Sequence, residues 1–512
     1  MKQARALALV LPLVCALGTA TAATPFNRQP WLKDYAYLKT ALEERYANLA
    51  WFGSAQSGVE LPALDRRTLR ALNAADSDEV AKVALLAFVS SFHDGHFSSV
   101  GTLQPKQGDL PTPPKPDYSK MNATEGCAAL GYVPVRSVAF SLPFESLPGT
   151  TLESDGLSRI FRAGVVTASD GTRFGIVRIS RFRQEDASPA GCVQAWKAQQ
   201  AVGGAIDTHA VTEAASGIWY ATLAAQLKHF REQQVAAVIV DVGGNSGGND
   251  SGDWAVRMFT EGEVHSARLL MSAAPLANLY FDEQLGDLHS AQKEEGISQE
   301  ARQALQEAVG AFEARKAGVA ARGCKLSWVW SEQRPWEPFG CSRLIDAGYA
   351  SGQASYLPAH AFGNEKVAES IYWAASVDSM RGAWGGPVYV LTDGQTASSA
   401  EMFAALMHDS GVARIVGRPT VGDGCGFMAD VPPVELPNSH LRFRVPNCVR
   451  LRADGSNEVA GVQPDLPVLP TAGESDRNRA YRVLETVAAD LHRRAPMNVM
   501  PAAGSVRPRD AQ

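Results

Sequence analysis

The sequence predicts an α/β fold, and two apolar runs with their neighbouring helices carry this prediction. Residues 235–242 form an unbroken apolar run, which is typical of a central strand covered on both faces, and an amphipathic helix is expected before it at residues 217–230. Residues 387–392 form a second buried run. A helical apolar stripe then begins at Ser398, and a further strand is expected at residues 412–416. Helices that alternate with buried strands indicate an α/β sheet.

Residues 1–23 predict a cleavable secretory signal. Two basic residues precede an apolar stretch, which ends in small residues with an A-x-A pattern at residues 20–22. No later apolar run is long enough to span a bilayer. We therefore expect an exported protein, periplasmic or secreted, without stable membrane insertion.

Six of the seven cysteines follow the predicted signal, and an even number in an oxidising compartment indicates disulfides. None shows the C-x-x-C spacing of a zinc site, and we expect neither a metal nor a cofactor. The sequence does not determine which cysteines pair; if each pairs with its neighbour in the sequence, the bonds are Cys127–Cys192, Cys324–Cys341 and Cys425–Cys448.

A net charge of −6 without a basic run gives no surface for a phosphate backbone, so no nucleic acid partner is expected.

Composition and periodicity divide the rest of the chain into four regions. We expect an N-terminal helical region at residues 24–103, a linker and variable region at 104–170, a core at 171–470 with a large, partly helical insertion at about 280–380, and a C-terminal helix and tail at 471–512.

Ser398 and Ser399 lie where the second buried run turns into a helix. Unpaired backbone N–H groups and the positive end of the helix dipole meet at such a turn, and acyl-transfer enzymes place a nucleophile there. Serine is also a favoured N-cap residue, so a capping role is the alternative.

Two further segments contain candidate site residues. A helix expected at residues 78–92 runs into the sequence HDGH, so His96 should project from a helix end; a structural role and a metal ligand are the alternatives. A glycine loop at residues 243–248 follows the first apolar run. It lacks the Walker spacing for phosphate, whereas Gly247 and Gly248 allow backbone N–H groups to approach an oxyanion.

Three ordered motifs resemble those of the C-terminal processing peptidases, or tail-specific proteases. They are DVGGNSGG at residues 241–248, TASSAEMFAALMHDSGVARIVGRPTVGDG at 396–424 and GVQPD at 461–465. The resemblance implies a serine peptidase with a crotonase-like core. It further implies Ser398 as nucleophile and oxyanion donors from Ser399 and from Gly247 or Gly248.

The chain departs from this family where the general-base lysine is expected, because Asp423 stands there. An aspartate is a weak base near pH 7, which excludes Ser-Lys catalysis at this site. A tricorn-like and retinoid-binding-protein-like branch also lacks the lysine. Similarity to its tricorn-like members implies His96 as base and Glu458 as the orienting acid, with Gly95 where that pattern has a serine.

The sequence therefore predicts an exported serine peptidase that acts on peptides or unfolded proteins through an acyl-enzyme. Residues 104–170 lack a carboxylate-binding loop, so no PDZ domain is evident. An esterase with the same site residues is one alternative. A non-catalytic periplasmic binding protein of the same fold is the other.

Overall fold

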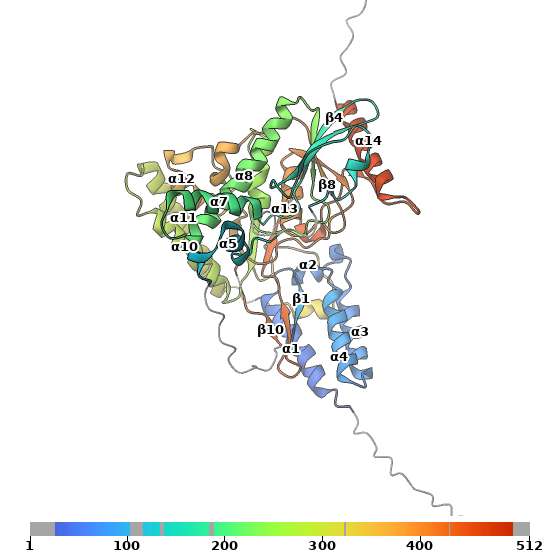
Figure 1. Cartoon of the computed structure of the whole chain (residues 1–512). Helices are drawn as coiled ribbons and strands as arrows, with labels where there is room; N and C mark the ends of the chain where they lie inside the picture. Colours follow the sequence, from blue (N-terminus) through green and yellow to red (C-terminus); the bar gives the residue numbers. More distant parts are fainter. Residues whose placement is uncertain are drawn as a thin grey trace, which may run out of the picture.

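The computed structural model describes residues 26–102, 116–133, 138–183, 189–321, 324–429 and 431–494. The predicted signal and the end of the predicted tail lie outside these residues. Within them, helices cover both faces of a seven-stranded sheet (Figure 1). This arrangement confirms the predicted α/β fold, while the crotonase-like topology and the domain boundaries stay predictions.

The central sheet has the strand order β13-β9-β8-β5-β4-β3-β2. Neighbours from β13 to β4 are parallel, and β3 pairs antiparallel with β4 and β2. Because β5 and β8 are parallel neighbours, the loops that follow them lie at the same edge. The strands are β2 Thr151–Asp155, β3 Arg162–Thr167, β4 Arg173–Arg178, β5 Ala237–Asp241, β8 Val388–Thr392, β9 Ala413–Gly417 and β13 Leu466–Pro467.

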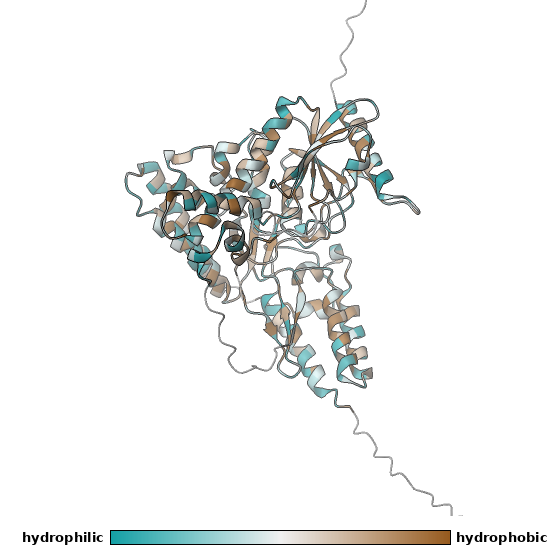
Figure 2. Cartoon of the chain, in the orientation of Figure 1, coloured by the Kyte–Doolittle hydropathy of each residue, from teal (hydrophilic) through white to brown (hydrophobic). Residues whose placement is uncertain are grey.

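Alternate side chains of the sheet enter two separate cores. Val238 and Val240 pack with helices α8 and α13, whereas Ala237 and Ile239 pack with α14 on the opposite face. Figure 2 shows these strands as predominantly hydrophobic between more polar helices. The three helices are α8 Thr208–Glu232, α13 Ser399–Asp409 and α14 Asp476–Arg494.

An N-terminal helical group lies below the central sheet in the view of Figure 1. A three-stranded sheet of order β1-β11-β10 joins this group to a late segment of the chain, and the two share one hydrophobic core. The elements are α1 Gln29–Arg45, α2 Leu49–Phe52, α3 Leu61–Ala74, α4 Asp78–Ser90, β1 Ser98–Thr102, β10 Val434–Glu435 and β11 Leu441–Arg444.

A third sheet, of order β12-β6-β7, packs against helices of the middle region. The insertion predicted at about 280–380 contains α11. These elements are β6 Arg268–Ser272, β7 Leu344–Tyr349, β12 Cys448–Arg450, α10 Ala277–Ala291, α11 Gln299–Gly318 and α12 Glu365–Ile371. The other α-helices of the described residues are α5 Ala123–Ala129, α7 Pro189–Val202 and α9 Ser251–Trp254.

All three predicted disulfides are confirmed, since Cys127 is bonded to Cys192, Cys324 to Cys341 and Cys425 to Cys448. The first joins α5 to α7. The third joins β12 to the loop after β9. Within the described ranges, no helix combines the length and apolar character that a membrane span requires.

Candidate active site

Ser398 lies between the end of β8 and the first residue of α13. Its backbone has φ 54° and ψ −120°, a conformation that non-glycine residues rarely adopt and that neighbouring contacts must hold. The hydroxyl of Thr396 donates to the carbonyl of Val242 at 3.1 Å. The N–H of Ala397 donates to the carbonyl of Asn245 at 3.0 Å. The loop after β5 therefore fixes the turn that presents Ser398.

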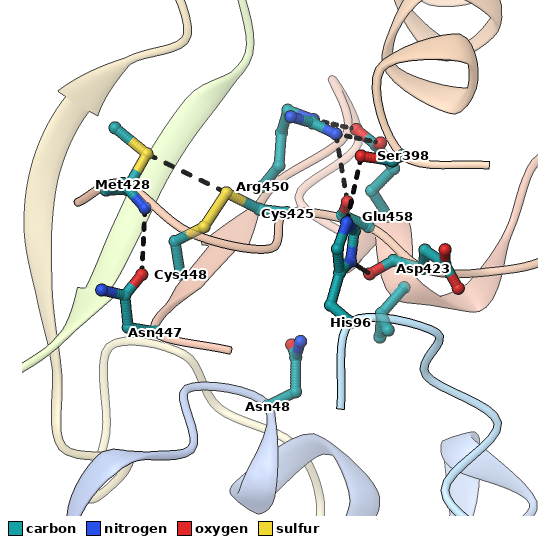
Figure 3. Close-up of a disulfide and its surroundings, with 12 residues drawn as sticks. Asn48, His96, Ser398, Asp423, Cys425, Met428, Asn447, Cys448, Arg450 and Glu458 are labelled. Atoms are coloured by element: carbon teal, nitrogen blue, oxygen red, sulfur yellow. Dashed lines mark hydrogen bonds and ion pairs between the residues drawn. A yellow bond between two sulfur atoms is a disulfide. The ribbon is translucent and has the colours of Figure 1, made fainter. Parts of the chain in front are cut away.

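His96 reaches Ser398 from the N-terminal helical group. Helix α4 ends at Ser90, and the chain turns before β1 starts at Ser98. The Nε2 atom of His96 lies 3.0 Å from the Oγ atom of Ser398, although 302 positions separate the two residues (Figure 3). The fold thus brings together the residues that the sequence predicts as nucleophile and base.

The other ring nitrogen of His96 identifies its tautomer. Nδ1 lies 3.2 Å from the backbone carbonyl oxygen of Asp423. Because a carbonyl oxygen can only accept, Nδ1 carries a proton, and in the neutral ring Nε2 is then free to accept from the hydroxyl of Ser398. This is the tautomer that a general base requires.

Gly426 provides the space for the His96 ring. A Cβ atom at this position would lie 2.6 Å from Cδ2 and 2.8 Å from Nε2 of the ring, so a side chain here would displace it. The neighbouring Phe427 ring meets the imidazole edge to face, with 6.1 Å between ring centroids. The Cys425–Cys448 disulfide joins this loop to β12 beside the site (Figure 3).

Glu458 is buried, and its carboxylate accepts hydrogen bonds from an arginine. Nε and Nη2 of Arg450 donate to it at 2.5 and 2.7 Å (Figure 3). Nη2 also lies 3.3 Å from the carbonyl oxygen of Gly424. Among the described residues, no hydrogen bond joins Glu458 to His96. The structure therefore brings Glu458 near the site through Arg450, not as a direct partner of the imidazole.

The predicted oxyanion donors differ in whether their N–H groups are free. Gly247 donates its N–H to Oδ1 of Asn245 at 2.8 Å, and a Cβ at Gly247 would lie 2.6 Å from Cβ of Ser398. Gly248 forms an isolated β-bridge with Phe182, and the hydrogen bonds of this bridge come from the residues on either side of Gly248. In the part of the chain that the structure describes, the N–H groups of Gly248 and Ser399 have no hydrogen-bond partner.

Glu401 organises the loop that contains Asp423. Burial raises the pKa of this carboxyl to about 7, although its hydrogen bonds act in the opposite direction. The carboxylate of Glu401 connects the turn at Ser398 to the loop beside His96. It accepts from the hydroxyl of Thr420 and from the N–H groups of Ser398, Gly422, Asp423 and Gly424.

Asp94 is a buried carboxylate beside the imidazole that the sequence did not single out. Its Oδ1 lies 3.7 Å from Nδ1 of His96 and accepts the N–H of His96 at 2.9 Å. The hydroxyl of Tyr46 donates to Oδ2 at 2.7 Å. Burial raises the pKa of Asp94 to about 6. Its place two residues before His96 in HDGH is a signal that could have identified it.

The described residues contain no group of three or more His, Cys, Asp or Glu side chains arranged to hold a metal ion. The contacts at Ser398 and His96 are instead those of a hydroxyl and a base within proton-transfer distance. Such a pair activates serine for attack on a carbonyl carbon.

Comparisons with solved structures show the class of fold. The crystal structure of mature CPAF matches with a TM-score of 0.53 at 15% identity, over 92% of this chain and 98% of that chain. Mature CPAF complexed with lactacystin matches with a TM-score of 0.54 at 16% identity, over 91% and 99%. The photosystem II D1 C-terminal processing protease has a TM-score of 0.32 at 14% identity, over 91% and 99%. The chain thus has the α/β fold of mature CPAF.

Residues 293–468 match the family model of peptidase family S41. This match confirms the resemblance to the C-terminal processing peptidases over that part of the chain. The matched range contains Ser398, Asp423 and Glu458, whereas His96 and the glycine loop precede it.

Proposed function

We propose that this chain is an exported serine peptidase that cleaves peptides or unfolded proteins through an acyl-enzyme. The match to peptidase family S41 supports a peptidase. The observation that carries the proposal is the 3.0 Å contact between Nε2 of His96 and Oγ of Ser398, a serine in a strained turn at a helix start. The three disulfides support export, because such bonds persist in oxidising compartments.

In the proposed reaction, Oγ of Ser398 attacks the carbonyl carbon of the peptide bond while its proton passes to Nε2 of His96. The N–H groups of Ser399 and Gly248 donate to the oxyanion that forms. The imidazolium then protonates the leaving amine as the C–N bond breaks, and the acyl group stays on Ser398. His96 next accepts a proton from water, whose oxygen attacks the ester; the proton returns to Ser398 as the acid leaves.

The carboxylates around His96 have different proposed parts in this reaction. Asp94 lies beside Nδ1 and stabilises the imidazolium that forms when Ser398 loses its proton. Glu458 contributes indirectly, because it holds Arg450 against the carbonyl of Gly424, next to the Asp423 carbonyl that orients His96.

Labelling with a fluorophosphonate tests the proposal. The probe should modify Ser398 in the wild-type protein and fail to modify Ser398→Ala, and folded wild-type protein that is not labelled near neutral pH would contradict an enzyme and support a binding protein. An esterase would use the same groups, so turnover of peptide and ester substrates by the same preparation distinguishes the two hydrolases. The contact between His96 and the strained serine favours a hydrolase over a binding protein.

A further inference from the structure

We propose that Asp423 is the positioning residue of this site and fixes His96 against Ser398 with two groups. This inference rests on the proposed function. Oδ1 of Asp423 accepts the N–H of Gly95 at 2.7 Å, and its carbonyl oxygen lies 3.2 Å from Nδ1 of His96. The contacts span 328 and 327 positions of sequence. One residue of the late chain therefore holds two consecutive residues of the loop that delivers the base.

The fit between Gly95 and Asp423 leaves no room for a side chain. A Cβ atom at Gly95 would lie 2.7 Å from each carboxylate oxygen of Asp423 and 3.0 Å from its Cγ. Gly95 is not among the described glycines with positive φ, so glycine is required here for space and not for backbone conformation. The close approach makes the position of the His96 loop depend on the carboxylate.

Asp423 is itself fixed relative to the nucleophile. Its N–H donates to Oε2 of Glu401 at 2.8 Å, and the same oxygen accepts the N–H of Ser398 at 3.1 Å. Glu401 thus ties Asp423 to Ser398, and Asp423 ties the pair to His96. The contact between His96 and Ser398 closes this ring of hydrogen bonds. The buried carboxylate of Glu401 therefore positions both reacting groups.

Among the described residues, the carboxylate of Asp423 has no cationic partner that would offset the cost of its burial. Asp423 is only 7% exposed, and in the described part of the chain no Lys, Arg or His side chain forms an ion pair with it. Burying a carboxylate without a cation is costly unless it is hydrogen-bonded. Its side-chain hydrogen bond goes to the loop beside His96, which points to a positioning role.

The test compares fluorophosphonate labelling of Ser398 in four variants. Asp423→Ala should lower the maximal labelling rate about 10- to 100-fold, because a small displacement of the base is costly, and leave the half-saturating probe concentration within about two-fold. Asp423→Asn keeps an acceptor for Gly95 and should lose less. Gly95→Ala should lower the rate strongly alone but only slightly in the Asp423→Ala background, where the added methyl has room.

Asp34 provides a matched control for general loosening of the fold. Its carboxylate accepts the N–H groups of Asn438 and Ser439 at 3.0 and 2.7 Å, so it also joins the N-terminal helical group to the late chain, at the turn between β10 and β11. Asp34→Ala should lower the thermal midpoint without the loss of labelling rate. Equal losses of rate in Asp34→Ala and Asp423→Ala would overturn the proposal.

Hydrogen exchange measured by mass spectrometry provides a readout that needs no catalysis. Asp423→Ala should raise exchange in the peptide that covers residues 92–102, because Gly95 loses its acceptor, and leave the α13 peptide unchanged. Unchanged exchange in residues 92–102 would overturn the positioning role whatever the labelling shows. If the wild-type protein is not labelled but Asp423→Ala raises exchange in this peptide, the result would support the contact between Asp423 and Gly95 and contradict the proposed peptidase activity.

Discussion

His96 and Ser398 lie 3.0 Å apart between Nε2 and Oγ, although the first follows an N-terminal helix and the second precedes α13. We expect His96→Ala to lower the rate of fluorophosphonate labelling about 100- to 10,000-fold, because the hydroxyl loses its proton acceptor. Labelling kinetics measure the loss, and circular dichroism with thermal unfolding confirms that the variant is folded. A folded variant with the wild-type rate would remove His96 from the mechanism.

Asn245 determines which glycine N–H is available to an oxyanion. Its Oδ1 accepts from Gly247 at 2.8 Å, and its Nδ2 donates to the carbonyl of Ile179 at 3.0 Å. Asn245→Ala releases both contacts, so the N–H of Gly248 should lose its alignment. We expect a fall of about 10- to 100-fold in kcat for a peptide substrate with little change in KM. A rise in KM alone would show that the loop binds substrate without stabilising the oxyanion.

Glu458 and Arg450 should behave as a buried ion pair. Glu458→Ala leaves a buried guanidinium without its partner, which should lower the free energy of unfolding by about 3 to 5 kcal/mol. The double variant Glu458→Leu/Arg450→Met removes both charges and should be less destabilised, as measured by denaturant unfolding. If Glu458 instead oriented His96 directly, Glu458→Gln would lower labelling without affecting stability.

Periodicity and local geometry predicted much of the fold and two site residues. The apolar run at 235–242 became β5, and the change of period at Ser398 became the turn into α13. Both predictions rest on local sequence, which determines which face of a strand or helix is buried. His96 could likewise be placed at the end of a helix from the pattern before it.

The partners of these residues could not be predicted, because they depend on contacts between distant segments. The family resemblance placed Asp423 where a lysine is expected, but it did not show that the carboxylate and carbonyl of Asp423 face Gly95 and His96. The family resemblance implied a donor at Gly247 or Gly248 without choosing between them. Among the described residues, the hydrogen bond from the N–H of Gly247 to the side chain of Asn245 distinguishes the two N–H groups.

Asp94 should make stability depend on pH below neutrality. Burial raises its pKa from 3.8 to about 6, so the folded state binds more protons than the unfolded state between these values. Stability therefore falls as the pH rises through this window, by about 3 kcal/mol in total. Asp94→Asn lacks this titration, so its thermal midpoint relative to wild type should rise between about pH 4 and pH 7. Glu401 titrates in both proteins, so its effect cancels in the comparison. A difference in thermal midpoint that does not change with pH would contradict the raised pKa of Asp94.

The Cys425–Cys448 disulfide should stabilise both the fold and the position of His96. It encloses 23 positions of sequence, and closing such a loop contributes about 3 kcal/mol by restricting the unfolded chain. Cys425 also lies two residues after Asp423 and one before Gly426, against which the His96 ring packs. We expect Cys425→Ser/Cys448→Ser to lower both the thermal midpoint and the labelling rate.

The Cys127–Cys192 disulfide is the matched control, because it joins α5 to α7 within a separate hydrophobic cluster. Cys127→Ser/Cys192→Ser should lower the thermal midpoint about as much as Cys425→Ser/Cys448→Ser does. The labelling rate of Ser398 should stay close to that of wild type. If the two double variants lose labelling equally at a temperature where both are folded, the Cys425–Cys448 bond acts only through global stability. A loss confined to the Cys425→Ser/Cys448→Ser variant would show that this disulfide holds the loop on which His96 rests.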